Sequence, residues 1–116
     1  MTRIVASGYE SLAAVLDQAL EQAQGGKGAE RHASGEPFVE QPIVSICEDL
    51  GGPQFAIGQA QKKSREALRL PHHRARAELL GAINYLAAAV IVLDRAQPNA
   101  LDAWQQWFDA NGRTEP

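Results

Sequence analysis

The amino-acid sequence predicts an all-α fold, a small bundle of about five helices around a central apolar helix. Three observations lead to this prediction. Good helix formers dominate the composition, whereas aromatic residues make up only 6% of it. Apolar residues recur at the spacing of one helix face, and glycine and proline separate these periodic segments. The 116 residues are enough for a modest core, so we expect residues 1–116 to form a single helical domain.

The first predicted helix begins near Ser7 and ends at Gly25 and Gly26. Ser7 and Glu10 have the spacing of a capping box, in which the hydroxyl and the carboxylate each satisfy a free backbone amide. An apolar stripe then follows one side of the helix and comprises Leu12, Val15, Leu16, Ala19, Leu20 and Ala23. The sequence therefore predicts a one-sided amphipathic helix.

Residues 25–37 are rich in glycine and charge and have no apolar period, so we expect a mobile loop. Loops of this length without secondary structure are often functional or disordered. Residues 38–42 are expected to be extended, because the residue before a proline, as at Pro37 and Pro42, is disfavoured in helical conformation.

Three further helices are expected over residues 42–50, 53–70 and 99–110. Proline is tolerated in the first turn of a helix, which allows the second helix to begin at Pro42. The third ends before Pro71, and the tight connection there makes it an antiparallel neighbour of the central helix. The last helix has an aromatic side formed by Trp104, Trp107 and Phe108, and a frayed tail begins at residue 113.

The central helix is expected over residues 78–95, and it is apolar on nearly every face. One side carries Leu79, Ile83, Leu86, Val90 and Leu93, and another carries Leu80, Ala87 and Ile91. A helix that is hydrophobic all round must be buried, and so small a chain offers little cover for it. We therefore expect a homo-oligomer, most simply a two-fold dimer.

The composition limits where the protein acts. The longest apolar run, residues 79–93, has 15 residues and includes Asn84, whereas a membrane-spanning helix needs about 20 apolar residues. The net charge of −3 disfavours binding to duplex nucleic acid. The single Cys47 cannot form an internal disulfide. We therefore expect a soluble, cytoplasmic protein that neither enters a membrane nor binds duplex nucleic acid.

A cluster of basic residues joins the third helix to the central one. It holds eight cationic or potentially cationic groups in 15 residues, namely Lys62, Lys63, Arg65, Arg69, His72, His73, Arg74 and Arg76. Adjacent histidines diverge on a helix and do not easily share one metal ion. Two interpretations remain open, a solvated helix face whose cations complement the helix dipole, and a site for an anion.

The segment between Gln59 and Asn84, with KKSRE on one expected helix and ELLG on the next, resembles the core of the MazG-like all-α nucleoside triphosphate pyrophosphohydrolases. In that family E-E-x-x-E and E-x-x-D bind Mg²⁺, which holds the phosphates of the substrate. Here the motifs fall on Lys62, Lys63, Glu66, Glu78 and Gly81. The resemblance covers about a quarter of the chain. Because lysine repels a metal ion, it implies that hydrolysis has been lost.

The leading hypothesis is therefore a non-catalytic protein that sequesters a nucleotide-type phosphate ligand without a metal or cofactor. Arginine suits this role because its guanidinium forks onto phosphate oxygens. Asn84 and Tyr85 could contact a base or ribose, although such residues more often form hydrogen bonds between helices. The expected ligand residues are Lys62, Lys63, Arg65, Arg69, Arg74, Arg76, Asn84 and Tyr85, with Arg31 and His32 in the covering loop.

By its small size, helical core and charged loop, the chain also resembles the small all-helical accessory proteins of bacteriophages. Some of those sequester signalling nucleotides (anti-CBASS sponges), and others plug a defence complex (anti-CRISPRs). Two alternatives follow from these resemblances. One is a divergent Mg²⁺-dependent pyrophosphohydrolase that uses Glu66, Glu78, Glu48 and Asp49. The other is a protein-interaction inhibitor that uses the side formed by Trp104, Trp107 and Phe108.

Overall fold

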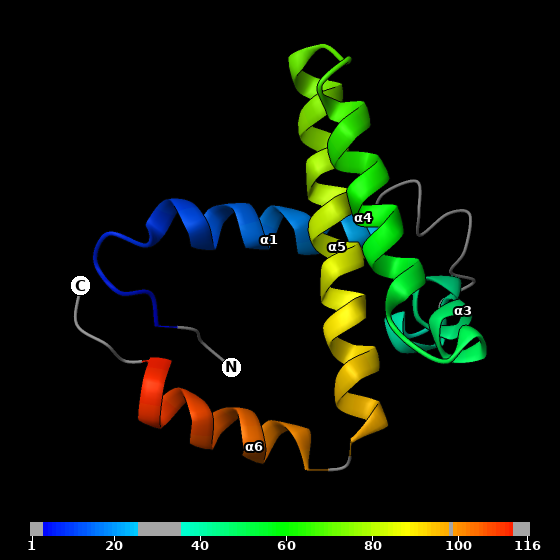
Figure 1. Cartoon of the computed structure of the whole chain (residues 1–116). Helices are drawn as coiled ribbons and strands as arrows, with labels where there is room; N and C mark the ends of the chain where they lie inside the picture. The colour runs from blue at the N-terminus through cyan, green and yellow to red at the C-terminus, as the bar shows by residue number, and fades with distance from the viewer. Residues whose placement is uncertain (1–3, 26–35, 98, 113–116) are drawn as a thin grey trace.

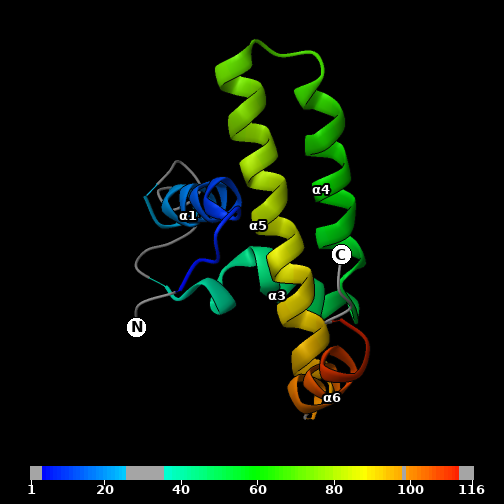
Figure 2. The same cartoon turned by 90° about the vertical axis from the view of Figure 1, so that its left-hand side faces the viewer.

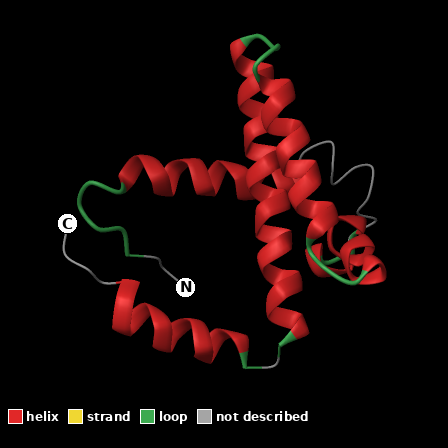
Figure 3. Cartoon of the chain, viewed as in Figure 1, coloured by secondary structure: helices red, strands yellow, loops and turns green. Residues whose placement is uncertain are grey.

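A computed structural model describes residues 4–25, 36–97 and 99–112. Within these ranges the backbone forms helices and no strand, so the all-α prediction is confirmed (Figure 3). The elements in chain order are α1 (Glu10–Gly25), the 3₁₀ helix η1 (Phe38–Glu40), α3 (Pro42–Leu50), α4 (Gln54–Ala67), α5 (His72–Ala96), α6 (Ala100–Trp107) and the π-helical turn η2 (Phe108–Gly112). Most of the predicted loop and the predicted tail lie outside the described residues.

The start of α1 differs from the predicted capping box. The Glu10 carboxylate accepts a hydrogen bond from the backbone amide of Gly8, at 3.0 Å, rather than from that of Ser7. Gly8 has a φ of +93°, which a residue with a side chain rarely adopts. The left-handed turn at Gly8 thus delays the helix, which begins at Glu10 rather than immediately after Ser7.

The segment before α3 is a short helix, so the prediction of an extended chain over residues 38–42 was wrong. The residues that flank η1, Pro37 and Gln41, are extended, with ψ values of 149° and 159°. Between them Phe38–Glu40 closes into one 3₁₀ turn, in which the Gln41 amide donates to the Phe38 carbonyl at 3.1 Å. Proline constrains only the residue before it, which left the middle of the segment free to turn.

Helix α3 has the predicted bounds, with Pro42 in its first turn and Gly51 as a left-handed cap at a φ of +86°. Helix α4 is shorter than predicted at its C-terminal end, where it stops at Ala67. The chain then continues as a turn, in which the Leu70 amide donates to the Ala67 carbonyl at 3.2 Å. Pro71 caps the start of α5, which includes the connection as well as the apolar stretch.

Helix α5 packs against α1, α3, α4 and α6. Helix α4 runs antiparallel beside it, whereas α1 and α6 both project to the same side of the α4–α5 pair (Figures 1 and 2). A core between α3, α4 and α5 consists mostly of small residues, namely Val44, Cys47, Ala56, Ala88, Ala89 and Val92. These small side chains allow the three helices to approach closely.

Within one chain α5 is covered on some sides only, which differs from the burial expected of an all-apolar helix. Leu79, Leu86, Val90 and Leu93 are each about half exposed, at 47%, 49%, 56% and 55%. Among the described residues α5 is the one helix long and apolar enough to cross a membrane, judged by length and composition alone. Only 28% of its most apolar window is buried.

Candidate anion-binding site

The outward face of α4 gathers three of the predicted cations. Lys62 and Arg65 lie three residues apart on one side of α4, and Arg69 follows in the turn after Ala67 and lines the same hollow. They line an open hollow of about 300 Å³, whose complete lining is Gly58, Gln61, Lys62, Arg65, Glu66 and Arg69. We call these six residues the α4 hollow. The structure thus brings together three of the eight predicted cations.

The charges in the α4 hollow are only partly neutralised. Lys62 Nζ lies 3.9 Å from Glu66 Oε1, and the two side chains are 67% and 48% exposed, so water screens the pair. Arg65 and Arg69 form no ion pair with another described residue. Each guanidinium group carries five N–H donors in a planar fork.

Lys63 lies on the other side of α4 and joins it to α5. Its Nζ is 3.4 Å from Glu78 Oε2, and both side chains are 28% exposed. The same ammonium lies 5.9 Å from the centre of the Tyr85 ring. Its methylene chain covers Gly81, where an added Cβ would meet Lys63 Cδ at 3.2 Å. We call Lys63, Glu78, Gly81 and Tyr85 the lysine clasp. The ammonium group of Lys63 is thus engaged by other residues of the same chain.

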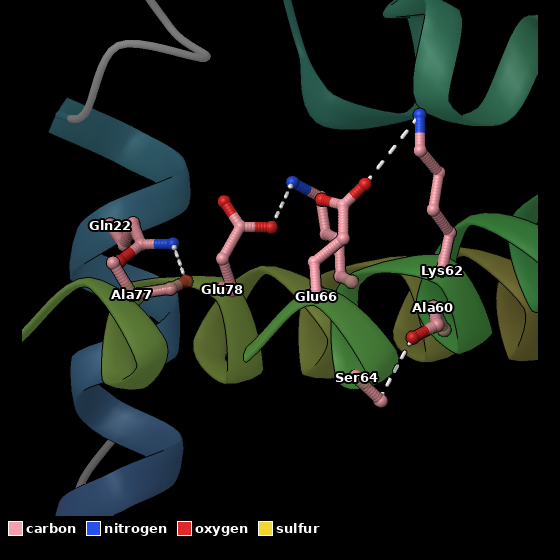
Figure 4. A network of polar contacts seen from close by, with 8 residues as sticks. Gln22, Ala60, Lys62, Ser64, Glu66, Ala77 and Glu78 are labelled. Atoms are coloured by element: carbon pink, nitrogen blue, oxygen red, sulfur yellow. Dashed lines mark hydrogen bonds and ion pairs between the residues drawn. The ribbon is translucent and has the colours of Figure 1, made fainter. Parts of the chain in front are cut away.

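Arg76 and Asn84 face α1 instead. Asn84 Nδ2 donates to the Ala19 carbonyl at 3.0 Å, and Arg76 donates to the side-chain oxygen of Gln18. Gln22 adds a third bond, from its amide to the Ala77 carbonyl at 3.0 Å (Figure 4). These bonds hold α1 across α5, so Asn84 belongs to the helix contact that the sequence left open as an alternative.

The remaining predicted cations do not join the α4 hollow. His72, His73 and Arg74 are exposed on the first turn of α5 and form no ion pair with another described residue. Arg31 and His32 lie outside the described residues. A cluster continuous in sequence is thus divided over the outer side of α4, the α4–α5 contact, the α1–α5 contact and the start of α5.

Three of the four carboxylates named for a metal ion, all but Asp49, have a basic partner among the described residues. Glu66 and Glu78, on neighbouring helices, pair with Lys62 and Lys63 (Figure 4). Glu48 lies 3.4 Å from the Nε of Arg95. The described part of the chain contains no group of three or more His, Cys, Asp or Glu side chains that could hold a metal ion.

Two residues of the α4 hollow, Gly58 and Gln61, were not predicted to belong to a site. Their signal is positional, because Gly58 precedes Lys62 by four residues and Gln61 precedes Arg65 by four, so each shares a helix face with a cation. Two further residues that were not predicted to make contacts, Gln18 and Gln22 of α1, form hydrogen bonds with α5.

Comparison with protein-family models, with curated proteins and with solved structures finds no match for this chain.

Proposed function

We propose that the chain is a non-catalytic binding protein that holds a phosphate-bearing ligand, of the nucleotide class, in the α4 hollow. The observation that carries this proposal is the pair Arg65 and Arg69, which share one face with Lys62 and form no ion pair with another described residue. A hollow of about 300 Å³ beside them is large enough to seat a small ligand.

Phosphate is the chemistry that this set of donors fits best. A guanidinium forms two parallel hydrogen bonds with a phosphate group, and side chains one turn apart reach neighbouring phosphates of one ligand. Gln61 adds an amide that can donate or accept. Because the hollow is open to water, its attraction for an anion weakens with added salt.

The position of the site narrows the set of ligand residues. Lys63, Arg76 and Asn84 are bound to other parts of the protein and support the helices rather than the ligand. Specificity for a particular base therefore has to come from residues near α4 or from a partner. Sequestration of a signalling nucleotide in the cytoplasm, as in phage anti-defence proteins, stays a prediction.

The lysine partners of Glu66 and Glu78 argue against the pyrophosphohydrolase alternative. A Mg²⁺ ion needs several oxygen ligands, and each of these carboxylates has an ammonium group beside it. Release of pyrophosphate from a nucleoside triphosphate in the presence of Mg²⁺, lost in Glu66→Gln, would replace our proposal with that alternative.

One observation favours the protein-interaction alternative. Trp104 and Trp107 on α6 are 53% and 58% exposed, and Trp104 stacks on Phe108 with ring centres 5.0 Å apart. Exposed aromatic residues of this kind often anchor protein interfaces. A specific partner that Trp107→Ala releases, together with no nucleotide binding, would favour this alternative.

The test is calorimetric titration with a panel of linear and cyclic nucleotides at low and at physiological salt. We expect binding that weakens with salt and that the double substitution Arg65→Gln, Arg69→Gln weakens at least about tenfold. Arg74→Gln is the matched control, because Arg74 is an exposed arginine outside the hollow. Absence of binding across the panel, or equal losses in the site and control variants, would refute the proposal.

A further inference from the structure

Helix α5 presents three faces, roughly 120° apart around its axis. Ala77, Leu80 and Asn84 belong to the face that meets α1. Gly81 and Tyr85 belong to the face that meets α4 through the lysine clasp. The third face has no helix of the described chain over most of its length. Leu79, Leu86, Val90 and Leu93 on this face are 47–56% exposed, whereas Ile83 is partly buried.

The side chains of this third face follow a strict pattern. Leu79, Ile83, Leu86, Val90 and Leu93 are separated by alternate steps of four and three residues. This is the a and d spacing of a two-helix coiled coil, in which Ile83 and Val90 take the a positions and the three leucines take the d positions. We call these five residues the α5 seam.

We propose that the α5 seam is the interface with a second copy of this chain, in which the two α5 helices pack in parallel about a two-fold axis. β-branched residues at a together with leucine at d are the combination that favours two parallel strands. An identical copy supplies the same spacing, so each side chain meets a matching hole in the partner helix.

The exposed area of the chain supports a second copy. The chain exposes 8831 Å², whereas a compact monomer of its 12.5 kDa mass is expected to expose about 6,200 Å². Its radius of gyration is 15.7 Å, against about 13.4 Å for a compact domain of this length. A stable dimer buries about 600–1,000 Å² from each partner, and the half-exposed leucines and valine of the α5 seam are part of the area available for it.

The ends of the seam favour a protein partner over a membrane. The apolar stretch is bounded by Glu78 and Asp94, so it is about 22 Å long, short of the roughly 30 Å core of a bilayer.

The first test is the mass of the protein in solution at micromolar concentration, by sedimentation velocity. We expect a dimer, and the double substitution Leu86→Lys, Val90→Lys should weaken its dissociation constant at least about a hundredfold. Leu68→Lys is the matched control, because Leu68 is 89% exposed at the end of α4 and lies outside the seam. Circular dichroism verifies that each variant keeps its helices.

A second test determines directly whether the two α5 helices run parallel, and it does not need a variant that disrupts the dimer. In a parallel dimer Leu79→Cys forms a disulfide with its own copy, and so does Leu93→Cys. In an antiparallel dimer a disulfide forms only when the two variants are mixed. Cys47 is buried and needs no replacement. Neither test uses a ligand, so its result is independent of the proposed nucleotide site.

Three outcomes would overturn the proposal. They are a monomeric wild-type protein, a dimer that the seam variant leaves intact, and transfer of the protein into neutral lipid vesicles. Disulfides that form only in the mixture would overturn the parallel arrangement. A monomeric seam variant beside a dimeric Leu68→Lys protein, with self-pairing at residues 79 and 93, supports it.

Discussion

The covered and the open sides of α5 are built from different kinds of residue. The covered sides bury mainly alanine, such as Ala88 at 0% and Ala89 at 5% exposure, and add polar bonds to α1 and α4. The open side carries large aliphatic residues, such as Leu86 at 49% and Val90 at 56% exposure. Burial of a leucine is worth about 1.5–3 kcal/mol. Much of the hydrophobic free energy that this helix could contribute is thus not used within one chain.

The two sides therefore have different tasks. Small residues give little transfer free energy but allow close packing, so the covered sides fix how α3, α4 and α5 meet. Large residues on the open side contribute little to the fold of one chain and stay available for the contact with a second copy that we propose. The predictions below test this difference, beginning with the largest effect.

The covered side should tolerate no added volume. Ala88 is fully buried in the core between α3, α4 and α5. We expect Ala88→Leu to lower the free energy of unfolding by about 1–3 kcal/mol, because it forces the three helices apart. Ala87→Leu makes the same change one residue earlier, where the side chain is exposed. This variant should alter the free energy of unfolding by less than about 0.5 kcal/mol.

Urea denaturation at one fixed protein concentration measures both variants. Equal losses for Ala88→Leu and Ala87→Leu would show that the two sides of α5 are not packed differently.

Much of the fold could be predicted from the sequence because glycine and proline act locally. Pro42 and Gly51 fixed both ends of α3, which has the predicted bounds. The end of α4 was predicted three residues too late, because Pro71 marks where a helix must have ended and not where its last hydrogen bond forms. The 3₁₀ turn at η1 has no such marker.

The candidate site was harder to predict, because neighbours in the sequence point in different directions. Lys62 and Lys63 are consecutive, yet one lines the α4 hollow and the other closes the lysine clasp. Periodicity shows that two such residues diverge by about 100°. It does not show which of them faces the next helix. Asn84 likewise has two predicted roles, and the packing of α1 decides between them.

The two lysines give the second prediction. Lys63→Ala leaves the half-buried carboxylate of Glu78 without its partner and uncovers Gly81, so the free energy of unfolding should fall by about 1 kcal/mol. Lys62→Ala removes the exposed ion pair with Glu66 and should change the free energy of unfolding by less than about 0.5 kcal/mol. Lys63→Met, which keeps the methylene chain, separates packing from charge. A loss from Lys62→Ala as large as that from Lys63→Ala would contradict the assignment of the clasp.

The smallest expected effect distinguishes two glycines on the paired helices. Gly58 lies inside α4, and a Cβ added there meets nothing within 4 Å. Gly58→Ala should therefore stabilise the protein by about 0.8–1 kcal/mol, the difference in helix propensity. Gly81→Ala gains the same propensity but brings its Cβ to 3.2 Å from Lys63 Cδ, so we expect a smaller gain.

The lysine itself provides the control for this last difference. The side chain of Lys63 is flexible, but its ammonium is held by Glu78, so it can move aside only by loosening the clasp. In a Lys63→Ala background, Gly81→Ala should recover the full gain of about 0.8–1 kcal/mol that Gly58→Ala gives. A double-mutant cycle from thermal and urea unfolding measures the coupling. A coupling of zero would mean that the lysine does not constrain Gly81, and that close packing on this side of α5 comes from the helices alone.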